Sequence, residues 1–278
     1  MGADRAAQVR AEIAELLDRH GLSPRRSLGQ NFLADPNITE RIVRTAEVGP
    51  GDQVVEIGAG TGTLTAALAD AGARVVSFEV DEGLRPVLDE VLAGRDDVEM
   101  RFTDAARLDL GEALEGGPWT LVANLPYHVG TGIVLDVLRH VPQVTDIVVM
   151  VQREVADRLL AGPGSKDYGL PSVVVGLHGD ARFAFGVPPQ VFLPQPKVES
   201  AVVRIRRRPA PPRAEEAIAL AAAAFGQRRK MLRRSLTEVL EDPEAVLTAA
   251  GIDPTARPED VPPEGWLALA EAAAEATS

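Results

Sequence analysis

Four residues near the middle of the chain, Asn124-Leu125-Pro126-Tyr127, have side chains suited to chemistry on an aromatic amine. The exocyclic amine of a base such as adenine is a weak nucleophile, because its lone pair is delocalised into the ring. The Asn124 side-chain carbonyl and a backbone carbonyl near Leu125 and Pro126 can accept both amine hydrogens and stabilise the charge that develops on nitrogen. Tyr127 can stack on the base. The alternative is a polar loop that ends a strand.

A glycine-rich segment, Glu56-Ile57-Gly58-Ala59-Gly60-Thr61-Gly62, ends the first of several apolar runs. Glycines at the carboxyl end of a first strand let the backbone approach a ligand closely. A dinucleotide fingerprint would place glycine at position 63, where Thr63 stands, and Glu56 is poorly suited to a position beside a pyrophosphate. The alternative to a ligand site is a tight turn between a strand and a helix.

Two carboxylates follow the next two apolar runs. Glu79 comes 21 residues after Gly58, at the place from which an acid binds ribose hydroxyls, and Asp104 can accept the exocyclic amine of an adenine. Together they favour an adenosine ligand that carries positive charge and no phosphate. S-adenosylmethionine, with its sulfonium and ammonium groups, meets both conditions. An NAD-dependent oxidoreductase is the weaker alternative, since no histidine is placed to relay a hydride.

Apolar runs alternate with helical patterns from Gln53 onward, which predicts an α/β fold. Buried strands separated by helices imply right-handed crossovers and a parallel sheet covered on both faces, in a doubly wound, Rossmann-like arrangement. Asp35-Pro36 marks a helix start. The segment 171–179 fits a helix or a strand. We expect strands near 54–57, 75–78, 98–102, 120–123, 147–150, 182–185 and 200–205, and helices near 4–19, 63–71, 82–92 and 131–140.

A proline-rich segment at 207–212 predicts a linker. Residues 1–208 would form an N-terminal helix with the Rossmann-like domain, and residues 209–278 a small helical domain. The second domain is expected to hold an alanine-rich helix near 213–225, a basic helix near 227–240 and two acidic pieces.

The net charge is −12, but it is unevenly distributed. Residues 201–235 hold nine arginines and one lysine against two glutamates, a local charge of +8, whereas residues 236–278 carry −9. A clustered basic segment attracts phosphates whatever the overall charge; the alternative is a solvated helix face. The candidate phosphate contacts are Arg25, Arg26, Arg228, Arg229, Lys230, Arg233 and Arg234.

Composition argues against several classes of protein. The chain contains no cysteine, which excludes disulfide scaffolds, iron–sulfur clusters and thiol nucleophiles, and its four histidines have no metal-ligand spacing. The first residues carry mixed charges unlike those of a signal peptide, and no apolar run is long enough to span a membrane. We therefore expect a cytoplasmic protein with no metal and no membrane partner.

Five segments of this chain occur in the order typical of ribosomal RNA adenine dimethyltransferases, a family that residues 20–270 resemble. Residues 225–236 are similar to the small-subunit, kasugamycin-sensitivity branch, since the macrolide-resistance enzymes that modify 23S rRNA usually have a different C-terminal domain. The segments are Ser27-Leu28-Gly29-Gln30-Asn31-Phe32-Leu33, Glu56 to Gly62, Asn124 to Tyr127, Phe192-Leu193-Pro194-Gln195-Pro196-Lys197-Val198 and Phe225-Gly226-Gln227-Arg228-Arg229-Lys230.

The resemblance implies a role for each matching residue. Asn31 and Leu33 would cover the cofactor, Gly58 and Gly60 would approach it, Glu79 would hold its ribose and Asp104 its adenine. Asn124 would lie between cofactor and target base, and Tyr127 and Phe192 would sandwich that base. Phe192 has an alternative reading as a core aromatic that anchors its proline-rich loop. His128 and Gly130 depart from the family, which more often has Asn and Ser there.

The activity implied is S-adenosylmethionine-dependent dimethylation of the N6 amines of two adjacent adenines near the 3′ end of 16S rRNA. The partner would be a 30S assembly intermediate during ribosome biogenesis, bound by a monomeric enzyme. Three alternatives stay open: 23S rRNA dimethylation of the macrolide-resistance type, DNA adenine methylation, and a ribosome assembly factor without relevant catalysis.

Overall fold

A computed structural model of the chain describes the backbone of residues 2–127 and 129–277. It describes the side chains of residues 6–127 and 129–276. His128, one of the two departures from the family, lies outside the described residues. The chain divides into two compact units, Met1–Ala156 with Arg182–Arg207, and Asp157–Ala181 with Arg208–Ser278. The first unit ends at Arg207, within the proline-rich linker expected from the sequence. Residues 157–181, expected in the first domain, belong to the second unit instead. The assignment of 209–278 to RNA binding stays a prediction.

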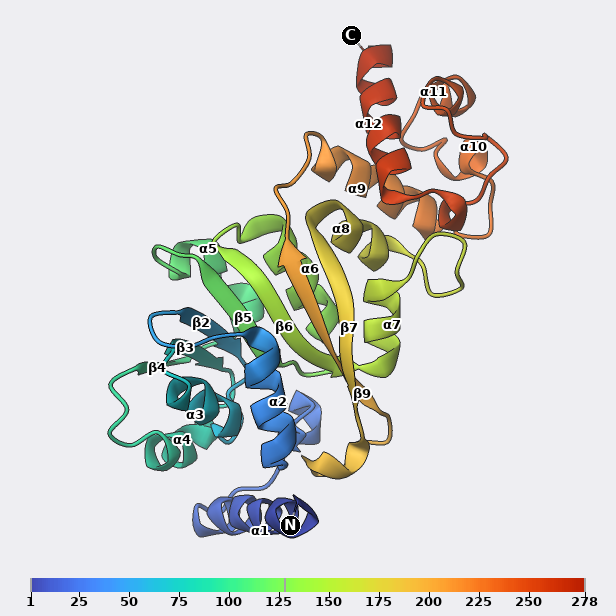
Figure 1. Cartoon of the computed structure of the whole chain (residues 1–278). Coiled ribbons are helices and arrows are strands. Elements are labelled where there is room, and N and C mark those ends of the chain that lie inside the picture. Colours follow the sequence, from blue (N-terminus) through green and yellow to red (C-terminus); the bar gives the residue numbers. More distant parts are fainter. Residues whose placement is uncertain (1, 128, 278) are drawn as a thin grey trace. The chain divides into compact units, whose positions relative to one another are not determined.

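The first unit is built on a seven-stranded sheet with the order β4-β3-β2-β5-β6-β9-β7 (Figure 1). The five strands from β4 to β6 are parallel, and β9 runs antiparallel to β6. This confirms the Rossmann-like α/β fold, and strand order reverses between β2 and β5, where such sheets bind ligands. The strands are β2 (Gln53–Ile57), β3 (Arg74–Glu79), β4 (Val98–Phe102), β5 (Trp119–Asn124), β6 (Val144–Gln152), β7 (Gly179–Val187) and β9 (Ser200–Arg207).

Helices cover this sheet because their apolar faces match its buried strands. Ile42 of α2 and Leu68 of α3 pack in one core cluster with Val54, Val122 and Val148 of the sheet, and α6 packs against β6. The Asp35 side chain accepts hydrogen bonds from Asn37 N and Ile38 N, as expected for the N-cap of α2. The helices are α1 (Gly2–Arg19), α2 (Pro36–Ala46), α3 (Thr63–Asp70), α4 (Arg85–Val91), α5 (Leu110–Ala113), α6 (Gly130–His140) and α7 (Arg153–Leu160).

A second, two-stranded sheet joins β1 (Phe32–Leu33) to β8 (Phe192–Leu193) in antiparallel register. Leu33 pairs with Phe192, and both side chains turn into the cluster formed with α2 and α3. This pairing connects the N-terminal loop to the proline-rich loop, which are about 160 residues apart in the sequence.

Several basic residues of β9 have structural partners within the first unit. Arg204, only 3% exposed, pairs with Asp146 and Glu47. Arg207 donates hydrogen bonds to the Val137, Leu138 and Val141 carbonyls at the end of α6. The basic segment at 201–235 is therefore not one continuous stripe available to phosphate.

The second unit is helical around a buried aromatic group. Tyr168 contacts Phe225 edge-on, Phe225 packs against Trp266, and Tyr168 Oη donates a hydrogen bond to Val261 O. The ambiguous segment 171–179 is helix α8 up to its last residue. The helices are α8 (Leu170–His178), α9 (Ala214–Gly226), α10 (Leu232–Ser235), α11 (Pro243–Ala249) and α12 (Pro263–Thr277). Within the described residues, no helix has the length and apolarity needed to cross a lipid bilayer.

The expected basic helix at 227–240 is wrong. Only Leu232–Ser235 is helical there, because Leu232 N and Arg233 N donate to the carbonyls of Ala256 and Pro254 instead of continuing α9. The arginines therefore do not share the faces of one long helix, and each has its own surroundings.

Candidate active site

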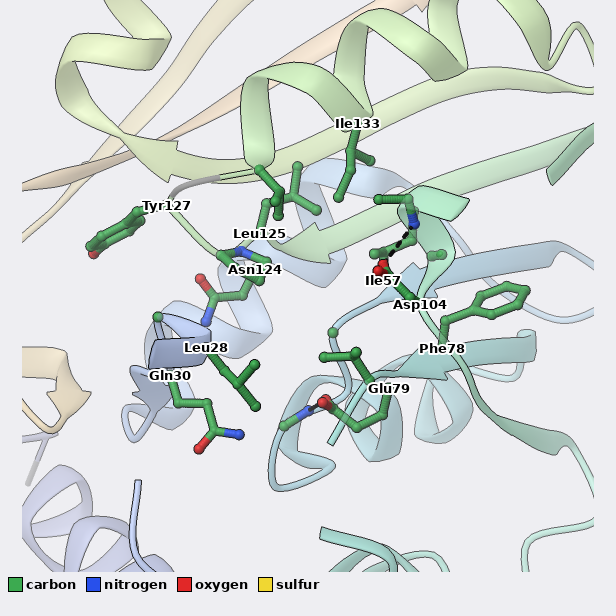
Figure 2. A pocket seen from close by; sticks show the side chains of 18 of the residues that line it. Leu28, Gln30, Ile57, Phe78, Glu79, Asp104, Asn124, Leu125, Tyr127 and Ile133 are labelled. Carbon is green, nitrogen blue, oxygen red and sulfur yellow. Dashed lines mark hydrogen bonds between the residues drawn. The ribbon is translucent and has the colours of Figure 1, made fainter. Parts of the chain in front are cut away.

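A cavity in the first unit lies where strand order reverses, at the carboxyl ends of β2, β3 and β5. Figure 2 shows Asn124 and Tyr127 on one side of it and Phe78, Glu79 and Asp104 on another. The carboxyl ends of parallel strands meet at one edge of a sheet, which explains why residues far apart in sequence converge here. Of the predicted site residues, the structure brings together on its wall Asn31, Gly58, Gly60, Glu79, Asp104, Asn124, Leu125, Pro126 and Tyr127.

The glycine turn forms the floor between β2 and α3. Gly58 has a φ of +86°, which L side chains rarely adopt, and its N–H donates to Phe78 O at 2.8 Å. At Gly60, with a φ of +57°, a Cβ atom would lie 3.1 Å from the Phe32 ring. These positions need glycine for backbone conformation and for space beside the cavity.

Glu79 is buried, with 6% of its surface exposed, yet its carboxylate lines the cavity. Oε2 accepts a hydrogen bond from Gly60 N at 2.8 Å, and Oε1 accepts one from Asp81 N at 2.9 Å. Burial raises the pKa of Glu79, and the two N–H donors oppose that rise. A carboxylate has about four acceptor sites, so it can bind two ribose hydroxyls in addition to these donors.

Asp104 caps the short turn after β4. Its Oδ1 accepts from Ala106 N at 3.1 Å, and its Oδ2 lies 3.1 Å from Arg107 Nε. Among the described residues that line the cavity, Glu79 and Asp104 carry the formal charges, and both are negative. Such a wall suits a cation and repels a phosphate, in keeping with the expected sulfonium cofactor rather than with NAD.

Asn124 ends β5 with its side chain held in one orientation. Its Nδ2 donates to the backbone oxygen of Asn31 at 3.1 Å, so Oδ1 remains the acceptor of the amide. Pro126 O accepts from Val129 N and Gly130 N, which begins α6. Because that carbonyl is already engaged, Leu125 O is the better second acceptor for an amine. A Cβ atom at Gly130 would lie 3.3 Å from Leu125 Cβ, so glycine permits close packing here.

Tyr127 is half-buried on the cavity wall, and its hydroxyl lies 2.9 Å from Ser200 Oγ at the start of β9. Burial raises the pKa of this phenol, which keeps it neutral. The expected sandwich with Phe192 is not present in this structure. Phe192 has no exposed surface and belongs to the core cluster because of its pairing with Leu33, as its alternative reading stated. Leu33 also belongs to that core and does not line this cavity, although it lines a smaller one with Gly58, Gly60 and Asn124.

Sequence reasoning missed several apolar or polar residues of the wall. Val80 stands out because half of its surface is exposed although it directly follows the buried Glu79. Its position directly after Glu79 could have indicated a place in the wall, since an apolar side chain there can cover a flat ring. The other missed residues include Leu28, Gln30, Phe32, Ile57, Phe78, Thr103 and Ile133.

Glu56 lies under the glycine turn and is fully buried. Its Oε2 accepts from Thr65 Oγ1 at 2.5 Å and Ser77 Oγ at 2.6 Å, whereas its buried Oε1 has no hydrogen-bond partner among the described residues. Burial raises the pKa of Glu56 to about 7, against the effect of the two hydroxyl donors and with a small contribution from Glu79. Glu56 therefore titrates close to neutral pH.

This titration gives a stability prediction. Folding raises the pKa of Glu56 from 4.5 to about 7, so its contribution is full below pH 4.5 and is lost as pH rises through 7. Glu56→Gln cannot ionise and should match the parent near pH 4 but exceed its unfolding free energy by about 3 kcal/mol near pH 8. Urea unfolding at both values measures this, with exposed Glu82→Gln as control. A pH-independent difference would contradict the assignment.

The seven candidate RNA-binding residues have different surroundings. Arg25 pairs with Asp81, Arg228 donates to Lys166 O, and Arg233 lies 3.7 Å from Glu244. Arg26 is exposed in the first unit, and Arg229, Lys230 and Arg234 are exposed in the second. The exposed members are the ones best placed to meet phosphates.

Residues 21–275 match the family model described as ribosomal RNA adenine dimethylase. The chain belongs to this family. It is 49% identical over 268 residues to ribosomal RNA small subunit methyltransferase A of Rhodospirillum rubrum, covering 94% of this chain and 91% of that protein. It is 46% identical over 263 residues to the protein of the same name from Phenylobacterium zucineum, covering 94% and 92%.

Solved structures support the fold and give one relative of another kind. The 23S rRNA methyltransferase ErmE is 31% identical, with a TM-score of 0.66 over 88% of this chain and 100% of that one. A dimethyladenosine transferase from Plasmodium falciparum is 23% identical, with a TM-score of 0.70 over 86% and 95%. The second likeness concerns the fold alone. Identity to the small-subunit enzymes exceeds identity to the 23S enzyme by 15 to 18 percentage points.

Proposed function

We propose that this member of the family transfers methyl groups from S-adenosylmethionine to the N6 amines of two adjacent adenines near the 3′ end of 16S rRNA. The substrate would be the rRNA within a 30S assembly intermediate, in the cytoplasm, and the enzyme would act as a monomer. The observation that carries this proposal is the Asn124 amide, fixed by Asn31 O on the wall of a cavity whose charged residues, among those described, are acids.

The residues of this cavity suit the cofactor. Glu79 offers acceptors to ribose hydroxyls, Asp104 offers one to an adenine amine, and Gly58 keeps the floor open. When bound, S-adenosylmethionine supplies an electrophilic methyl group. Glu79 and Asp104 would orient the nucleoside, and the loop at 28–32 would limit access of water.

Asn124 would act on the target base. Its Oδ1 and a backbone oxygen of the motif accept the two amine hydrogens, which pulls the nitrogen toward tetrahedral geometry and stabilises the charge it gains. Holding the reacting atoms about 3–3.5 Å apart lowers the barrier further. No strong base is needed, because an alkylated amine is acidic and releases its proton to water.

Tyr127 would receive the base on its ring. A stacked or paired adenine cannot reach Asn124, so the target has to leave its stack, as in other enzymes that act on bases. The hydrogen bond to Ser200 fixes the tyrosine ring before the base arrives. Stacking on such a ring contributes about 1–3 kcal/mol per base.

The test is transfer of labelled methyl groups to under-methylated 30S particles, compared with 50S particles and duplex DNA. We expect incorporation into the 30S sample only, at two adjacent adenines. Incorporation into 50S particles alone would favour the 23S activity that the name of ErmE describes, and incorporation into DNA would favour the DNA alternative. Binding to 30S particles without transfer would leave the assembly factor.

Exposed cations of the second unit would contact the rRNA backbone. We expect the triple variant of Arg229, Lys230 and Arg234 to alanine to reduce the slope of log K against log salt by about 2–3, because each lost phosphate contact removes about 0.7–0.9. Fluorescence anisotropy at several salt concentrations measures the slope. Arg74→Ala, at the opposite end of β3 from the cavity, is the control. An unchanged slope in the triple variant would exclude these contacts.

A further inference from the structure

The loop from Ser23 to Asn31 forms part of the cavity wall and has its own internal closure. Arg25 N donates to Gln30 Oε1 at 2.8 Å, Gln30 N donates to Arg25 O at 3.3 Å, and Asn31 Nδ2 donates to Gly29 O at 3.0 Å. Leu28, Gly29, Gln30 and Asn31 all line the cavity. The segment is thus a small closed loop placed over the candidate cofactor site.

Asp81 fastens this loop to the sheet. Its Oδ1 lies 2.8 Å from Arg25 Nη1, and its Oδ2 accepts from Gln30 Nε2 at 2.8 Å. Asp81 is 5% exposed, whereas the Arg25 side chain is 55% exposed. A buried carboxylate is costly unless it is paired and hydrogen-bonded, so the loop supplies what Asp81 needs.

The same residue is connected to the ribose-binding candidate. Asp81 N donates to Glu79 Oε1, so the backbone of Asp81 orients Glu79 while its side chain holds the loop. At its other end the loop is held by Asn124, through Asn31 O. The loop therefore spans the two strand ends between which the proposed reaction would occur.

We propose that Asp81, Arg25 and Gln30 form a latch that holds the 23–31 loop closed over S-adenosylmethionine, and that this latch opens when the cofactor enters and leaves. The inference rests on the proposed function for the identity of the ligand. Asp81 and Arg25 are positioning residues, since they act through the loop and through Glu79. Arg25 then serves the cofactor, although sequence alone suggests that it binds RNA.

Calorimetry and stopped-flow release of S-adenosylmethionine test the latch. Arg25→Ala and Asp81→Asn should each weaken binding and speed release about tenfold or more, the size expected when a hydrogen bond to a charged group is lost. Arg25→Lys, which keeps the positive charge and one donor nitrogen, should recover part of the affinity. With saturating cofactor, kcat should stay near that of the parent while KM for the cofactor rises. The neighbouring exposed Glu82→Gln is the matched control.

Hydrogen exchange of the protein without cofactor gives a second readout. The amides of Leu28, Gly29 and Gln30 are hydrogen-bonded within the loop. They should exchange faster in Arg25→Ala and Asp81→Asn than in the parent, and at the parent's rate in Glu82→Gln. Weaker binding with unchanged exchange would place the effect on Glu79 alone and overturn the latch. Parent-like binding in the variants would also overturn it. Absence of binding to the parent would instead reject the proposed function.

Discussion

Replacement of Asn124 by alanine is expected to lower the rate of methyl transfer at least about 10²-fold, the loss seen when one preorganised charge-stabilising group is removed. The reason is that Oδ1 is aimed by the bond from Nδ2 to Asn31 O, and alanine offers no acceptor in its place. Single-turnover transfer to under-methylated 30S particles measures the chemical step directly. RNA binding should survive, because Asn124 carries no charge and is not one of the candidate phosphate contacts.

Asn124→Asp separates the two roles of this amide. It keeps an acceptor oxygen but loses the donor to Asn31 O. If acceptance of the amine protons drives the reaction, this variant should transfer faster than Asn124→Ala. Equal inactivity of both variants, with the 23–31 loop opened in hydrogen exchange, would assign the defect to the lost anchor instead. Near-normal transfer by Asn124→Ala would refute the mechanism.

Glu79→Gln should weaken cofactor binding about 10²-fold, since two hydrogen bonds from ribose hydroxyls to a charged acceptor are worth about 1.5 kcal/mol each or more. The neutral amide also offers one oxygen where the structure needs acceptors for both Gly60 N and Asp81 N. KM for the cofactor should therefore rise more than kcat falls. Calorimetric titration with S-adenosylmethionine provides the measurement.

Glu82→Gln again serves as control, because it changes the same charge in the neighbouring exposed turn. Thermal unfolding without cofactor shows how much of the Glu79 effect is structural. We expect a lower Tm for Glu79→Gln, because one buried N–H loses its acceptor. Unchanged affinity in a folded Glu79→Gln protein would exclude the ribose contact.

Much of the sheet, and the residues at the carboxyl ends of its strands, could be predicted from the sequence for a physical reason. Buried parallel strands need continuous apolar runs, so the runs at 54–57 and 120–123 mark strands directly, and residues that follow such strands converge in space. Gly58, Glu79, Asp104 and Asn124 are of this kind. Their positions depend on local patterns and on one general rule of topology.

The errors concern residues whose environment is set by distant partners. Phe192 turns into the core because its backbone pairs with Leu33, about 160 residues away. The chain at 231–233 leaves the helical path because its amides bond to residues 254–256. Arg25 pairs with Asp81, 56 positions along the chain, and its contact with RNA stays a prediction. No local periodicity encodes such pairings, and each one sets the environment of a candidate functional residue.

The carbonyl of Pro126 has a consequence for the motion of the catalytic segment. Because it accepts from Val129 N and Gly130 N, the segment that carries Asn124 is hydrogen-bonded to an eleven-residue helix whose inner face is buried. Loosening the turn means fraying that helix, and the cooperativity of the helix resists this. We therefore expect the target-base side of the cavity to move less than the cofactor side, where the proposed latch consists of side-chain hydrogen bonds.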